Sequence, residues 1–71
     1  MKIVTDSGYN GAALGRCYYV TQRVVGFSED TTGEEIKAFV DVEKKAWYGQ
    51  EFSARVEGKV VHIRRGVDSG D

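Results

Sequence analysis

The segment Thr31-Thr-Gly-Glu-Glu-Ile-Lys-Ala-Phe-Val-Asp-Val-Glu-Lys-Lys-Ala-Trp-Tyr-Gly49 decides the fold. Its start matches a capping box, with Thr32 as the N-cap residue and Glu35 three positions later. Apolar residues then recur at the i, i+3 and i+4 spacing that places them on one face of a helix. A lysine pair suits the negative end of the helix dipole, and a glycine follows it. The sequence therefore predicts one helix from Thr32 to Tyr48.

The middle of the same segment has a second interpretation. From Ile36 to Val42, apolar and polar residues also alternate, which is the period of a β-strand. Valine is a weak helix former, and two valines lie in this stretch. If residues 36–42 form a strand, the protein is a small all-β barrel or sandwich. The end signals favour the helix.

Short alternating runs before the helix predict β-strands. Residues 2–5 are a candidate first strand. Residues 6–16 contain three glycines and an Asn-Gly pair, and they predict a glycine-rich loop. Residues 17–27 are rich in β-branched and aromatic residues and predict the longest strand. We assign its more apolar face to the core (Tyr18, Val20, Gln22 and Val24) and the other face to the open side of the sheet (Tyr19, Thr21 and Arg23).

Residues 51–65 predict a β-hairpin with a two-residue turn at Glu57-Gly58. This register pairs Ala54 with Val61, and it gathers most of the large apolar residues on one face. The opposite face carries Ser53, Arg55, Val60, His62 and Arg64, with Glu51 opposite Arg64. Residues 66–71 have little to bury, so we expect this tail to fray.

These elements predict one α+β domain spanning residues 1–71. We expect an antiparallel sheet of three or four strands with one helix packed on one face, in the order ββαββ. A chain of 71 residues buries a limited core, so self-association as a homodimer or binding to a large partner is favoured.

Composition excludes several function classes. Cys17 is the only cysteine and His62 the only histidine, so the sequence predicts no disulfide, no zinc site and no cofactor. A net charge of −1 argues against a nucleic-acid binder that depends on bulk charge. A lone cysteine, an N-terminus without a signal peptide and the lack of a long apolar run predict a cytoplasmic protein that is not in the membrane.

The sequence contains no recognisable catalytic set, and we expect a protein that is not an enzyme. Because one helix covers one face of a sheet, the other face is open to a partner. Arginine and tyrosine are enriched at protein–protein hot spots. The predicted partner-binding residues on that face are Tyr19, Arg23, Arg55, His62 and Arg64. A weaker candidate is an acidic docking patch around the helix start, formed by Glu29, Asp30, Glu34 and Glu35.

These features predict a non-enzymatic module that occupies a surface of a larger protein or ribonucleoprotein complex. The concrete hypothesis is a phage or mobile-element inhibitor of a host defence complex, of the anti-CRISPR kind. The alternative is a small nucleic-acid-binding or regulatory protein, because arginine and tyrosine on an open sheet also hold phosphates and stack on bases.

Overall fold

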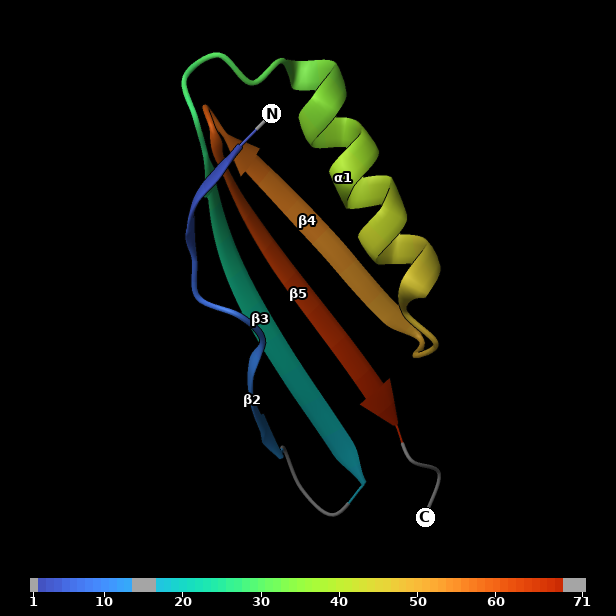
Figure 1. Ribbon diagram of the computed structural model, residues 1–71. Helices are drawn as coiled ribbons and strands as arrows, with labels where there is room; N and C mark the ends of the chain where they lie inside the picture. The colour runs from blue at the N-terminus through green and yellow to red at the C-terminus, as the bar shows by residue number, and fades with distance from the viewer. Residues whose placement is uncertain (1, 14–16, 69–71) are drawn as a thin grey trace.

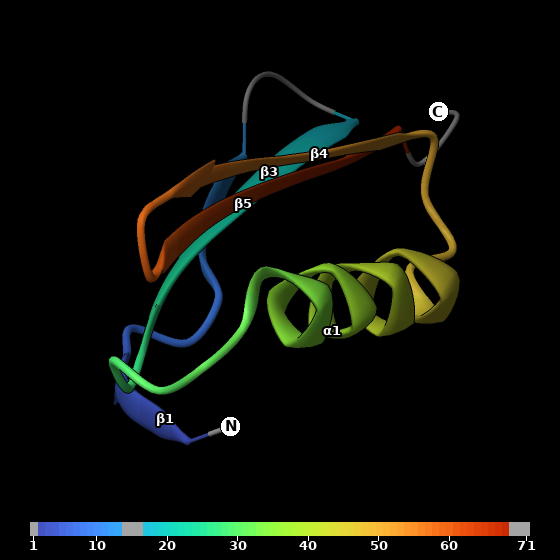
Figure 2. The same ribbon diagram turned by 90° about the horizontal axis from the view of Figure 1, so that it is seen from above.

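In the computed structural model, which describes residues 2–13 and 17–68, one helix lies on one face of an antiparallel sheet (Figures 1 and 2). The elements are β1 (Ile3–Asp6), β2 (Asn10–Ala13), β3 (Tyr18–Phe27), α1 (Gly33–Ala46), β4 (Glu51–Glu57) and β5 (Val60–Asp68). The strand order is β1-β3-β5-β4, and β2 also pairs with β3. The α+β prediction is confirmed, and the all-β alternative is wrong because residues 36–42 are helical.

Two irregular segments are more ordered than the sequence predicts. The expected glycine-rich loop at 6–16 contains β2, whose residues pair with β3 from Asn10–Gln22 to Ala13–Tyr19, while residues 14–16 lie outside the described part of the chain. The expected tail at 66–71 begins as strand, because β5 continues to Asp68 beside β3. Residues 69–71 also lie outside the described part. Pairing with the long strand β3 supplies the backbone partners that both segments lack locally.

The helix begins as predicted. The Thr32 hydroxyl accepts a hydrogen bond from the Glu35 backbone N–H at 3.1 Å, and a Glu35 carboxylate oxygen accepts one from the Thr32 N–H at 2.9 Å. This second bond lowers the pKa of Glu35. The helix ends at Ala46 with Trp47 as the C-cap residue, two residues earlier than predicted. Gly49 therefore does not cap the helix; it lies where a side chain would meet the Trp47 ring and the Gly66 carbonyl, each 2.7 Å from the added carbon.

The core lies between α1 and the two central strands. Val25 and Phe27 from β3, Val61 and Ile63 from β5, and Ile36 from α1 are all at most 4% exposed. Phe39 of α1 packs edge-on against Phe27, with ring centroids 5.2 Å apart. Because β5 lies between β3 and β4 and contributes fully buried residues, it is the central strand of the core.

The predicted faces are correct for the hairpin and wrong for β3. Opposed residues in an antiparallel pair share a face, and Arg23 is opposite Ile63 while Val24 is opposite His62. The odd-numbered residues of β3 therefore face the helix, and the even-numbered ones face the open side. The core depends on Val25 and Phe27 at the end of the strand, and these fix the orientation of its whole length.

The hairpin turn lies one residue later than predicted. Residues 58 and 59 form the turn, with Glu57 opposite Val60, so Ala54 is opposite Ile63 instead of Val61. Gly58 has a φ of 61° in the first turn position, where a type II′ turn requires glycine. The change shifts the register by two residues, and a shift of two leaves every side chain on its predicted face.

Candidate functional site

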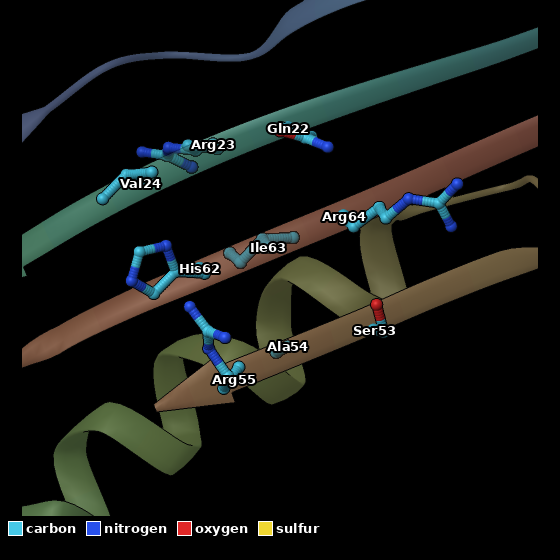
Figure 3. Close-up of a pocket in the computed structure, with 9 residues that line it drawn as sticks. All are labelled: Gln22, Arg23, Val24, Ser53, Ala54, Arg55, His62, Ile63 and Arg64. Carbon is cyan, nitrogen blue, oxygen red and sulfur yellow. The ribbon is translucent and has the colours of Figure 1, made fainter. Parts of the chain in front are cut away.

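The sheet face opposite the helix carries the candidate site, which we call the open-face groove. Its side chains form two rows across β3, β5 and β4. One row is Val24, His62 and Arg55; the other is Gln22, Arg64 and Ser53. Figure 3 shows both rows, with His62 between Val24 and Arg55. Together with the intervening residues Arg23, Ala54 and Ile63, they line a groove of about 360 Å³.

An acidic residue holds the basic side chains at each end of the groove. At one end, Glu57 contacts both Arg55 (Nη2 to Oε1, 2.9 Å) and His62 (Nε2 to Oε1, 3.3 Å). At the other end, Arg64 Nη1 lies 3.2 Å from Glu51 Oε2. The Glu57–His62 and Glu51–Arg64 contacts run diagonally across the β4–β5 ladder, whereas Arg55 and Glu57 are neighbours on the same face of β4. The groove therefore presents positioned guanidinium groups whose charge is balanced.

A tyrosine closes the Glu51 end of the groove. The Tyr18 hydroxyl donates a hydrogen bond to Glu51, and this bond raises the pKa of the tyrosine. The phenol lies over Gly66, where an added side-chain carbon would be 2.5 Å from the Tyr18 oxygen. Glycine at position 66 therefore allows Tyr18 to lie flat across β5 and reach β4.

The structure separates the predicted partner-binding residues into two groups. Arg55, His62 and Arg64 share the open face as expected. Tyr19 and Arg23 lie on the helix side, because each is opposite a helix-side residue of β5, Val67 and Ile63 respectively. Tyr19 is 48% exposed, since it lies near the end of the sheet away from the core. The prediction of one surface containing all five residues is wrong.

Arg23 belongs to a cluster between the sheet and the helix. Its guanidinium makes a bidentate pair with Asp6, with Nε–Oδ1 and Nη2–Oδ2 distances of 2.9 and 2.5 Å. Its Nη1 donates to Glu43 of α1 at 2.5 Å, and Glu43 also accepts from the Tyr9 hydroxyl at 2.9 Å. The guanidinium carbon lies 5.2 and 5.4 Å from the Tyr9 and Phe39 ring centroids. The bond from Arg23 lowers the pKa of Asp6 to about 2, while burial raises that of Tyr9.

Arg65 lies next to the Arg23 cluster on the helix side of the sheet, and its position there was not recognised from the sequence. Its guanidinium carbon lies 3.3 Å from the Tyr9 ring centroid and 4.2 Å from the Trp47 ring centroid. Its Nε donates to the Thr21 hydroxyl at 3.3 Å. The indole nitrogen of Trp47 is buried and has no hydrogen-bond partner among the described residues. Arg65 alternates in sequence with Ile63 and Val61, and that spacing alone places it on the core side.

The acidic residues near the helix start mostly have local structural contacts. Asp30 accepts a hydrogen bond from the Ser28 hydroxyl at 2.5 Å, which lowers its pKa. Glu35 completes the capping box. Glu29 and Glu34 are exposed. Beside them, Lys59 in the hairpin turn donates to the carbonyl of the buried Thr31, so this loop joins the hairpin tip to the helix start.

Other site types find no support in the described residues. Cys17 is a half-buried free thiol. Over residues 2–13 and 17–68, no three His, Cys, Asp or Glu side chains are grouped as metal ligands. The single described helix lacks the length and apolar character needed to cross a membrane. We compared the chain with protein-family models, curated proteins and solved structures, and none of them matches it.

Proposed function

We propose that this protein is a non-enzymatic binding module that occupies a surface of a larger protein through the open-face groove. One observation carries the proposal: the groove places arginines beside exposed apolar and polar side chains on a sheet face that no described element covers (Figure 2). Val24, on the β3 side of the groove, is 39% exposed. Arginine held beside apolar surface is typical of protein–protein hot spots.

The charge of this face favours a protein partner over nucleic acid. On β3, β4 and β5 it carries two arginines and three acids: Arg55, Arg64, Glu51, Glu57 and Asp68. Phosphate backbones are bound by an excess of positive charge. The aromatic residue that could stack a base there, Tyr18, is hydrogen-bonded to Glu51, and Tyr19 lies on the other face. Support for the nucleic-acid alternative therefore falls.

In biological terms, we propose a small inhibitor that covers a functional surface of a larger assembly. An anti-CRISPR protein acting on a cytoplasmic ribonucleoprotein of the host is one concrete case. A small rigid sheet suits this role, because binding then requires little ordering of the inhibitor itself. Catalysis by the inhibitor is not needed.

A comparative pull-down tests the proposal. Wild-type protein, the double variant Arg55→Ala/Arg64→Ala and the control Lys37→Ala/Lys45→Ala would be used as bait in host lysate. All four residues are exposed, and the control pair lies on the helix. We expect a partner that the wild type and the control retain and the groove variant loses, followed by the same ranking in calorimetry with the purified partner. Equal retention by the three baits would refute the groove as the binding surface.

A nuclease-treated lysate and an oligonucleotide titration separate the two kinds of partner. A protein partner should remain bound after nuclease treatment. Binding of single-stranded oligonucleotide at low salt, with an affinity that falls steeply as salt rises, would instead support the nucleic-acid alternative.

A further inference from the structure

The two edges of the sheet differ in how they are protected. The edge formed by β1 and β2 is broken into two four-residue strands, and its register shifts between Ile3 and Thr5. Bulges and short strands of this kind prevent an edge from pairing with another chain. The opposite edge, β4, has seven residues in unbroken register with β5. It contains no proline, lysine or bulge, and its three charged residues, Glu51, Arg55 and Glu57, include both signs of charge.

The helix leaves most of β4 uncovered, and Phe52 is its one partly buried residue. Ala54 and Val56 have their side chains on the helix side of the sheet, yet Ala54 is exposed and Val56 is 51% exposed. Within the described chain, β4 pairs with β5 alone. A two-residue turn makes Glu57 and Val60 a hydrogen-bonded pair, and bonded pairs then alternate along the ladder. The backbone groups of Phe52, Ala54 and Val56 consequently point away from β5, towards the edge.

We propose that two copies of this chain associate by antiparallel pairing of their β4 edges. The sequence of the edge favours one register. With Ser53 at the two-fold axis, Glu51 of each copy lies opposite Arg55 of the other, which forms two pairs of opposite charge. The same register places Phe52 opposite Ala54 on the helix side. With Ala54 at the axis, Glu51 would instead face Glu57.

The pairing has a geometric consequence for the open-face groove. The two-fold axis of an antiparallel strand pair is perpendicular to the sheet, so both helices lie on one side and both grooves on the other. The two copies together then form one continuous sheet that is eight strands wide. Because a single strand of each copy takes part, we expect the contact to bury less than the roughly 1,200 Å² at the low end of specific interfaces and the dimer to form at micromolar or higher concentration. This inference does not rest on the proposed function, although Arg55 takes part in both surfaces.

A charge-exchange experiment tests both the edge and its register. In a dimer of the Glu51→Arg variant, the new arginine of each copy faces Arg55 of the other copy. In a dimer of the Arg55→Glu variant, the new glutamate of each copy faces Glu51 of the other copy. Each variant alone should dimerise about tenfold more weakly than the wild type. An equimolar mixture restores both opposite-charge pairs and should recover association. Sedimentation equilibrium over a wide concentration range measures the three dissociation constants, and circular dichroism checks that each variant is folded.

A matched pair of lysine substitutions provides a second measurement. Ala54→Lys places a charge at the centre of the edge, whereas Ala38→Lys makes the same change at an exposed position on α1. We expect dimerisation to be lost only in Ala54→Lys. A wild-type mass of 7.9 kDa at every concentration would overturn the proposal. So would equal effects of the two lysine variants, or a mixture of the charge variants that stays as weak as its components.

Discussion

Replacing Arg23 should destabilise the fold far more than replacing Arg55, although the sequence assigned the same role to both. The Arg23→Ala change removes the three hydrogen bonds to Asp6 and Glu43 and two ring contacts. The side chains of Asp6 and Glu43 are 30% and 19% exposed, so solvent weakens the first pair more than the second. With about 1 to 2 kcal/mol for the hydrogen bonds and about 1 kcal/mol for the ring contacts, the expected loss is about 2 to 3 kcal/mol.

Such a loss is large for a chain of this size. Stabilities scale at about 0.05 to 0.15 kcal/mol per residue, which gives about 4 to 11 kcal/mol here. The thermal midpoint should therefore fall by about 10 to 20 °C. Arg55→Ala should cost less than about 0.5 kcal/mol, because that side chain is 69% exposed and its one ion pair is on the surface.

Urea unfolding followed by fluorescence measures both changes, because Trp47 is the only tryptophan and lies against Arg65, which shares the Tyr9 ring with Arg23. A third variant, Arg23→Met, keeps much of the apolar stem and isolates the contribution of the charge. Equal losses for Arg23→Ala and Arg55→Ala would refute the assignment of Arg23 to the helix-side layer.

Three further predictions concern pH, packing and close backbone contact. Because the folded pKa of Asp6, about 2, lies below its ordinary 3.8, its stabilisation is complete above about pH 5 and is lost progressively as pH falls towards 2. The loss should be about 1 kcal/mol after allowance for solvent exposure, and acid titration of Asp6→Asn should lack it. Ile63→Ala should cost about 2 to 5 kcal/mol in urea unfolding, because this side chain is 1% exposed at the centre of the core; a cost below 1 kcal/mol would contradict that packing. Gly49→Ala should lower the thermal midpoint and shift Trp47 emission, because the new methyl meets the indole ring, whereas Gly33→Ala has open space and should raise the midpoint slightly. The same change in midpoint for both glycines would argue against the close approach.

The local elements of this fold could be predicted from the sequence because their signals are local. The capping box at Thr32 and Glu35 lies within four residues, and its geometry is confirmed. The faces of the β4–β5 hairpin were predicted correctly, although the turn was displaced by one residue. Glycine is suitable for either the first or the second residue of a two-residue turn. The φ of Gly58 in the structure shows that it occupies the first position, which the sequence alone does not indicate.

The face of β3 could not be predicted in this way. Between residues 18 and 24 the more apolar face is the even-numbered one, yet it lies on the open side, so the alternation indicates the wrong face. Arg23 resembles a solvent-facing residue until its partners are known. Those partners, Asp6 and Glu43, lie 17 and 20 residues away in sequence, on opposite sides of β3 along the chain. Two of the five predicted site residues, Tyr19 and Arg23, therefore lie on the helix side, while Arg55, His62 and Arg64 share the open face.

The position of β5 between β3 and β4 also has a consequence for how the chain folds. The residues that β4 and β5 pair are separated in sequence by 3 positions at the turn (Glu57 and Val60) and by 15 positions at the far end (Glu51 and Gly66). β3 and β5 pair residues from 34 apart, at Gly26 and Val60, to 50 apart. Closing such long loops lowers the chain entropy before stabilising contacts have formed. The pairing of β3 with β5 should therefore limit the folding rate. We expect the hairpin and the helix to form early, and β3 to add to β5 from the hairpin tip towards the far end of the sheet.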